Sequence, residues 1–273
     1  MRDHPSATPV THPLLQTALA AAEAAAQVHL RWIGRVSVRE AALKGTSDFV
    51  SQADLEAQQA AIAVISQRHP DHRVLAEEDE APGSTATAGP PLWVLDPIDG
   101  TTNFLHGHPM YCVSVAVLVG GTPEAGVVAC PSTSERWWAT RGGGAFKSGR
   151  RIRVSDPQDL RTALVGTGFP FKALHLLDEY LAQMGRVLRN SAGVRRGGAA
   201  AIDLAYVASG SLDAFWELDL KPWDVMAGVL LIREAGGVVA RLDGSPIDIE
   251  PGSLLAAANP ELAEALRAVV LKG

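Results

Sequence analysis

Apolar residues recur along the chain at two spacings, and each spacing predicts one kind of element. Alanine and leucine at intervals of three and four residues predict helices, which we place at 13–32, 51–67, 174–188, 199–209, 222–235 and 260–270. Short apolar runs predict strands at 73–76, 93–95, 111–119, 125–129, 136–140, 163–165, 214–216, 238–240 and 254–257. Residues 1–10, 44–48 and 82–91 are rich in turn-forming residues and are predicted to be loops.

The order of these elements changes along the chain. In the first half, strands follow one another across short turns such as 120–121 and 131–133, which predicts antiparallel pairing and an α+β arrangement. In the second half, helices and strands alternate, which is typical of an α/β layer. We therefore predict two lobes, residues 1–155 and residues 156–273.

Composition narrows the class of protein. With 273 residues, of which 47% are hydrophobic, the chain can bury a substantial core. A formal net charge of −6 argues against a protein that coats nucleic acid or an anionic membrane, so we expect neither as a partner. An anionic substrate would need a local positive charge, such as a bound metal ion.

Two observations concern the compartment. The cysteines, Cys112 and Cys130, lie in apolar strand-like stretches, which favours buried free thiols in a reducing compartment over a disulfide framework. No apolar run approaches the length of a membrane span, and the first residues do not have the pattern of a signal peptide. We expect a cytoplasmic protein.

The stretch from Trp93 to Phe104 contains the candidate chemistry. An apolar strand runs directly into two aspartates, and Pro97, which has no N–H to donate, is predicted to end that strand. Asp96 and Asp99 then converge on one point, where two carboxylates repel each other unless one is protonated or a cation lies between them. The backbone N–H groups of the next three residues, 100–102, would favour a phosphate if they start a helix.

This stretch resembles a known family. The run from Asp96 to Phe104, Asp-Pro-Ile-Asp-Gly-Thr-Thr-Asn-Phe, is similar to the signature of the inositol monophosphatase family of magnesium-dependent phosphatases. Trp223-Asp224-Val225, followed by residues 234–237, resembles the second signature, and Glu77-Glu78 stands where the family has an acidic pair. The resemblance covers nearly the whole chain. It implies the layered αβαβα sandwich of inositol monophosphatases and fructose-1,6-bisphosphatases.

The resemblance also implies a role for each candidate residue. Two Mg²⁺ ions, or three where a weaker site fills, would be held by Glu77, Asp96, the Ile98 carbonyl, Asp99 and Asp224. The catalytic residues would be Thr101, Asp54 and Glu77, with Thr101 and Asp54 orienting the attacking water. The substrate would contact Asp99, Gly100, Thr101, Thr102, Gly198, Ala200, Glu217 and Asp224. Family members of this type are inhibited by lithium and form homodimers.

Each acid also has a structural interpretation. Asp54 completes a capping-box pattern that begins at Ser51, and Asp224 lies in the first turn of a predicted helix. An acidic pair such as Glu77-Glu78, or an acid at a strand end such as Glu217, is usually a solvated surface charge. We expect no lysine or arginine among the converging acids. Arg195 and Arg196 are the nearest positive charges, and they could belong either to the site or to a surface or interface.

The sequence therefore predicts an enzyme, a phosphoric monoester hydrolase acting on inositol 1-phosphate or a similar small polyol phosphate through metal-activated water. Histidinol phosphate, fructose 1,6-bisphosphate and 3′-phosphoadenosine nucleotides are substrates of related branches. Thr102 favours the inositol branch, because the nucleotidase and histidinol-phosphatase branches often have lysine or arginine there. The alternative of another class is a non-catalytic metal-binding interaction protein.

Overall fold

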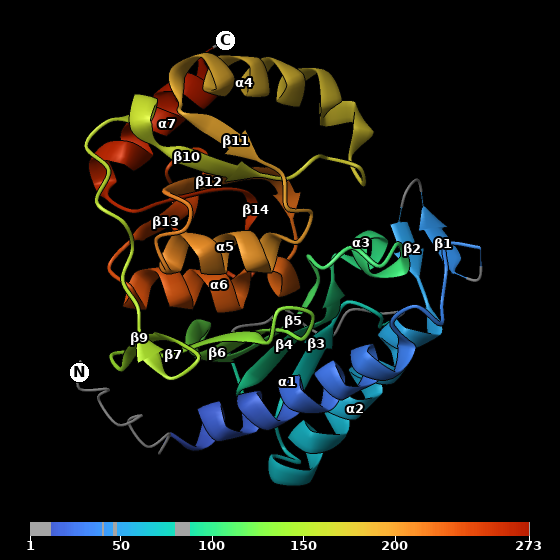
Figure 1. Ribbon diagram of the computed structural model, residues 1–273. Coiled ribbons are helices and arrows are strands. Elements are labelled where there is room, and N and C mark those ends of the chain that lie inside the picture. The colour runs from blue at the N-terminus through green and yellow to red at the C-terminus, as the bar shows by residue number, and fades with distance from the viewer. Residues whose placement is uncertain (1–11, 40, 46–47, 80–87, 273) are drawn as a thin grey trace, which may run out of the picture.

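The computed structural model describes residues 12–39, 41–45, 48–79 and 88–272, and their side chains except at 43–45, 48 and 49. These residues form five layers, in the order helices, sheet, helices, sheet, helices (Figure 1). The αβαβα sandwich that the sequence predicted is therefore confirmed.

The first sheet has seven strands in the order β3-β4-β5-β6-β7-β8-β9. Their bounds are β3 Arg73–Ala76, β4 Leu92–Asp99, β5 Cys112–Val119, β6 Thr122–Cys130, β7 Glu135–Thr140, β8 Gly144–Lys147 and β9 Arg150–Arg151. Only the β3–β4 pair is parallel among these neighbours. The predicted hairpin series is confirmed, and β8 and β9 extend it beyond the apolar pattern from which it was predicted.

The second sheet has five strands in the order β11-β10-β12-β14-β13. Their bounds are β10 Leu164–Thr167, β11 Gly193–Arg195, β12 Ala214–Leu220, β13 Val238–Arg241 and β14 Gly252–Ala257. β10 is parallel to both of its neighbours, and β14 is antiparallel to both of its own. The edge strand β11 was not predicted, because it contains a single apolar residue.

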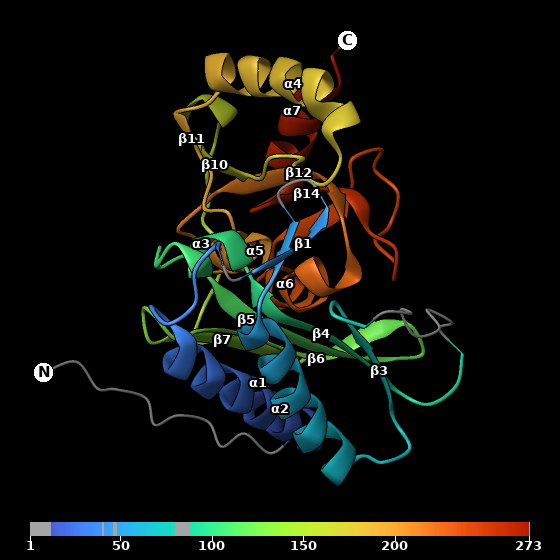
Figure 2. The same cartoon turned by 90° about the vertical axis from the view of Figure 1, so that its right-hand side faces the viewer.

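Helices fill the other three layers. α1 (Pro13–Trp32) and α2 (Gln52–Arg68) cover the outer face of the seven-stranded sheet, and α4 (Leu177–Asn190) and α7 (Pro260–Leu271) cover that of the five-stranded sheet (Figures 1 and 2). α5 (Ala200–Ala208) and α6 (Pro222–Glu234) lie between the sheets. Both are apolar nearly all round, as helices buried on every side must be.

Two short elements stand beside these layers. A hairpin of β1 (Ala42–Gly45) and β2 (Asp48–Val50) lies near the one-turn helix α3 (Thr101–Leu105), as Figure 1 shows. The prediction of a loop at 44–48 was therefore wrong where the residues are described. Residues 1–10 and most of the loop predicted at 82–91 lie outside the described residues.

The prediction that Pro97 ends the central strand was also wrong. β4 continues to Asp99, and its register against β5 shifts between Asp96 and Asp99, so the proline occupies an irregularity where a ladder donor is not required. The Pro97 carbonyl accepts a hydrogen bond from His29 Nε2 of α1 at 2.8 Å. Burial lowers the pKa of His29 to about 4, so this histidine is neutral at pH 7.

Cys112 and Cys130 are buried free thiols, as predicted. In the part of the chain that the structure describes, no helix is both long enough and apolar enough to cross a bilayer. The division into lobes at residue 155 stays a prediction, since α5 and α6 contact both sheets.

Candidate active site

The candidate site is a cavity between the two sheets. Strand ends, the starts of α3, α5 and α6, and the segment after β10 all contribute to its wall. Of the twelve site residues predicted from the sequence, eleven line this cavity: Glu77, Asp96, Ile98, Asp99, Gly100, Thr101, Thr102, Gly198, Ala200, Glu217 and Asp224. The twelfth, Asp54, is hydrogen-bonded to Thr101.

Three carboxylates meet at the centre of the cavity. Asp96 and Asp99 come from the irregular end of β4, and Asp224 comes from the first turn of α6. Each offers an oxygen within 4.8 Å of the others. Burial, and then the charges of Glu77, Asp99 and Asp224, raise the pKa of Asp96 well above its ordinary value. Holding these buried carboxylate charges together costs free energy unless a cation compensates them.

Two of these carboxylates also cap helices. Asp99 Oδ2 accepts a hydrogen bond from the Ala201 N–H at the start of α5, at 2.8 Å. Asp224 Oδ2 accepts one from the Lys221 N–H at 2.7 Å, as the first-turn interpretation predicted. Burial nevertheless raises the pKa of Asp99 to about 6 and that of Asp224 to about 8. These bonds hold the two side chains in place but do not offset the cost of burying their charges.

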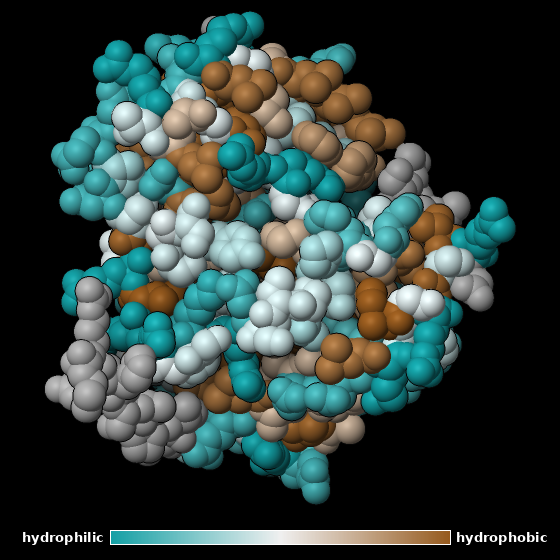
Figure 3. All heavy atoms as spheres, in the orientation of Figure 1, coloured by the Kyte–Doolittle hydropathy of each residue, from teal (hydrophilic) through white to brown (hydrophobic). Residues whose placement is uncertain are grey.

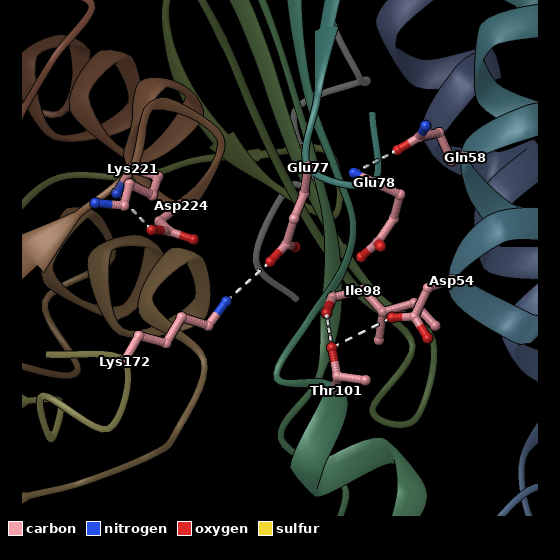
Figure 4. A network of polar contacts seen from close by, with 9 residues as sticks. All are labelled: Asp54, Gln58, Glu77, Glu78, Ile98, Thr101, Lys172, Lys221 and Asp224. Carbon is pink, nitrogen blue, oxygen red and sulfur yellow. Dashed lines mark hydrogen bonds and ion pairs between the residues drawn. The ribbon is translucent and has the colours of Figure 1, made fainter. Parts of the chain in front are cut away.

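Thr101 connects the cluster to Asp54. Its hydroxyl lies 3.2 Å from Asp54 Oδ1 and 3.1 Å from the Ile98 carbonyl oxygen, and both of these atoms are acceptors (Figure 4). The other carboxylate oxygen of Asp54 accepts from the backbone N–H of Ser51 at 2.8 Å. Asp54 therefore completes the predicted capping box and holds Thr101 at the same time. Burial raises the pKa of Asp54 to about 6.

Glu77 faces the cavity, whereas the backbone N–H of Glu78 donates to Gln58 Oε1 at 3.0 Å (Figure 4). The Glu77 carboxylate also forms an ion pair with Lys172, with Nζ and Oε1 3.0 Å apart. The expectation of no lysine among the acids was therefore wrong. Lys172 lies 95 residues further along the chain, and only the packing of the two sheets brings it here.

The opposite wall is formed by the segment after β10 and by α5. Gly168 packs against Glu217 so closely that a Cβ there would lie 1.9 Å from Glu217 Oε1. Burial raises the pKa of Glu217 well above its ordinary value. Asp203, which was not predicted from the sequence, also lines the cavity, and burial followed by the charge of Asp99 raises its pKa.

Arg196 also lines this wall, which favours the site role over the interface role at this position. Its guanidinium lies over the rings of Phe169 and Phe171, at 4.9 and 5.0 Å from their centroids. One feature of the sequence pointed to the segment after β10, because loops after parallel strands in α/β sheets commonly bind ligands.

The donors fit a hard divalent cation. All are oxygens, they converge, and Asp96 Oδ1 is buried with no hydrogen-bond partner among the described residues. A carboxylate oxygen in that position costs free energy unless a cation binds it. The residues present therefore fit magnesium ions.

A five-layered sandwich with a carboxylate cluster beside a threonine–aspartate pair is the fold and site pattern expected of the inositol monophosphatase class of layered α/β proteins. The chain belongs to the inositol monophosphatase family, whose model matches residues 10–272. Members of this family are in general magnesium-dependent.

Among its relatives, "Nus factor SuhB" of Pseudomonas aeruginosa is 43% identical over 246 residues, which cover 89% of this chain and 91% of that protein. "Inositol-1-monophosphatase" of Rhizobium meliloti is 43% identical over 240 residues, 88% of this chain and 89% of that protein. The crystal structure of extragenic suppressor protein suhB from Bartonella henselae matches with a TM-score of 0.88 at 37% identity, covering 96% of this chain and 100% of that one.

Proposed function

We propose that this chain is a Mg²⁺-dependent phosphomonoesterase that hydrolyses inositol 1-phosphate or a similar small polyol phosphate. One observation supports this above the others: the carboxylate cluster, with Asp96 Oδ1 buried and unpartnered among the described residues, lies beside the Thr101–Asp54 pair. The inositol-1-monophosphatase of Rhizobium meliloti supports the choice of substrate class.

The proposed metal ligands are Glu77, Asp96, the Ile98 carbonyl, Asp99 and Asp224. They would hold two Mg²⁺ ions, with a weaker third ion as an option. Bound there, the ions would lower the pKa of a water molecule and stabilise the negative charge that develops on the leaving oxygen.

Thr101 and Asp54 orient the attacking water in this proposal. The single Thr101 proton is directed toward two acceptors, Asp54 Oδ1 and the Ile98 carbonyl, so the lone pairs of its oxygen are left to accept from water. Asp54, as a carboxylate, would then take up a proton from the hydroxyl as the hydroxyl takes one from water.

The phosphate would contact the N–H groups of Gly100, Thr101 and Thr102, since the first N–H groups of a helix have no intrahelical acceptor. The alcohol portion would lie against Gly198 and Ala200, with Glu217 bound to its hydroxyls. A buried carboxyl with a raised pKa can donate as well as accept, which suits a hydroxyl.

The decisive experiment compares Asp96→Asn and Asp224→Asn with Asp178→Asn, an exposed aspartate on α4 that serves as the control. Phosphate release and calorimetric Mg²⁺ binding should both be lost in the first two variants and unchanged in the third. Unaltered Mg²⁺ affinity in both cavity variants would contradict the ligand assignment.

A second candidate function is that of a Nus factor, because the relatives of Pseudomonas aeruginosa, Salmonella typhimurium and Escherichia coli carry that name. It would make the chain an interaction protein in the cytoplasm, with or without catalysis. Rescue of a strain that lacks its own SuhB separates the two. Rescue by wild type but not by Asp96→Asn would assign the function to the metal site, and equal rescue would assign it to interaction.

We also propose a homodimer. Leucines at 174, 177, 181 and 188 are exposed on or beside α4, and Figure 3 shows apolar side chains gathered over that helix at the top of the molecule. Light scattering should give a mass of twice 28.8 kDa. A monomer at micromolar concentration would contradict this proposal.

A further inference from the structure

Lys172 is a cation of the cavity lining to which the proposed function gives no role. Its Nζ lies 3.0 Å from Glu77 Oε1, and the Glu77 side chain is 11% exposed. Figure 4 shows Lys172 extending to Glu77 from the far side of the site, near Asp224. The ammonium therefore occupies one face of the carboxylate cluster.

The backbone that bears Lys172 is fixed. The Phe171 N–H donates to the Phe169 carbonyl at 2.8 Å, and the Ala173 N–H donates to the Pro170 carbonyl at 3.0 Å. The two phenylalanine rings meet edge to face, 5.6 Å apart, and both contact the Arg196 guanidinium. Lys172 therefore extends from a hydrogen-bonded turn at the edge of the cavity.

An ammonium cannot be a metal ligand, and the Lys172 ammonium at Glu77 Oε1 both takes up one lone pair of that oxygen and repels a cation placed beside it. Glu77 is one of the proposed Mg²⁺ ligands. The lysine and the metal ion therefore compete for the Glu77 carboxylate, and the divalent ion is the stronger partner because it carries twice the charge.

We propose that Lys172 is a tethered counter-ion that competes with Mg²⁺ for Glu77, and that an anionic phosphate ester relieves this competition by binding the released ammonium. The inference rests on the proposed metal-dependent function. Lys172 lines the same cavity as Gly100 and Thr101, beside which the phosphate is proposed to bind. Metal ion and phosphate then bind cooperatively, and each raises the affinity for the other by the same factor.

Lys221 offers a matched control. It is a lysine that lines the same cavity, 45% exposed against 51% for Lys172, and its ammonium pairs with Asp219 at 3.0 Å. Asp219 is not a proposed metal ligand. Lys172→Met and Lys221→Met therefore remove the same charge near the cluster, but only the first removes a direct competitor.

The test is calorimetric titration of each protein with Mg²⁺, with and without inorganic phosphate. Because a partly exposed ion pair contributes up to about 1 kcal/mol, Lys172→Met should raise Mg²⁺ affinity about fivefold over Lys221→Met. Phosphate should strengthen Mg²⁺ binding to wild type and much less to Lys172→Met. Lys172→Arg, which keeps the charge, should resemble wild type. In EDTA, Lys172→Met should melt lower than Lys221→Met.

Two results would overturn the proposal. If wild type binds Mg²⁺ but the two methionine variants bind it equally, or if phosphate strengthens binding as much in Lys172→Met as in wild type, the competition is refuted and the phosphatase proposal stands. If wild type binds no Mg²⁺, both proposals fail.

Discussion

Replacing Gly100 with alanine should disable the site through the backbone alone. Gly100 has φ +88°, a left-handed conformation that costs an L-residue with a side chain about 1–2 kcal/mol. A Cβ at this position would lie 2.8 Å from the Met110 carbonyl oxygen and 3.2 Å from that of Gly198. Both carbonyls are restrained, because Asn103 Nδ2 donates to the Met110 carbonyl at 2.6 Å and to the Gly198 carbonyl at 3.4 Å.

The size of the effect follows from these two terms. Overpacking of this kind costs about 1–3 kcal/mol, so strain and contact together amount to about 2–5 kcal/mol. Gly107 is the control, since it has φ +69° and nothing within 4 Å of its Cβ position. Gly107→Ala should lose only the strain energy, about 1–2 kcal/mol.

Activity should separate the two variants further. Widening the turn at Gly100 displaces the Thr101 hydroxyl and Asp99, and a displacement of about 1 Å can reduce the rate about 10²-fold. The assays are urea unfolding and kcat/KM for inositol 1-phosphate with Mg²⁺. If kcat/KM of Gly100→Ala lies within about threefold of that of Gly107→Ala, the close contact does not position the site.

Four further predictions follow from the site. Thr101→Ala should lower kcat by about 10²–10⁴-fold with little change in Mg²⁺ binding, and an unimpaired kcat would mean that the hydroxyl does not orient the water. Burial raises the pKa of Asp54 and Asp99 to about 6 and that of Asp224 to about 8, above the ordinary 3.8. Protonation of these groups therefore stabilises the folded state, and this stabilisation is lost as the pH rises through their pKa values. The metal-free protein in EDTA should melt at a higher temperature near pH 5 than near pH 8. A lower melting temperature near pH 5 would contradict this. Glu217→Ala should impair inositol 1-phosphate hydrolysis far more than hydrolysis of an ester without ring hydroxyls, and equal losses would make Glu217 structural. Lithium should inhibit at millimolar concentration when Mg²⁺ is limiting, and indifference to lithium would argue against the proposed ligand geometry.

The carboxylate cluster could be predicted from the sequence because its parts are local. Asp96 and Asp99 stand three residues apart at the end of an apolar run, and Asp224 follows a tryptophan and a proline at a helix start. Such short-range patterns determine strand ends and first turns. The layers could be predicted for a similar reason, since the apolar spacing that marks a helix or strand is set by its buried face.

Other features depend on packing that no short pattern encodes. Lys172 meets Glu77 only because two sheets built from distant parts of the chain face each other. Pro97 remains within a strand because the β4–β5 register shifts there and His29 of α1 binds its carbonyl. The β1–β2 hairpin forms from residues whose composition is typical of a loop.

The most direct test of the central claim is phosphate release from inositol 1-phosphate by the purified chain, measured with Mg²⁺ and with EDTA. Histidinol phosphate, fructose 1,6-bisphosphate and adenosine 3′,5′-bisphosphate serve as comparison substrates. Hydrolysis should require Mg²⁺, be fastest on inositol 1-phosphate and be abolished by Asp96→Asn. Absence of Mg²⁺-dependent release from all four esters would contradict it.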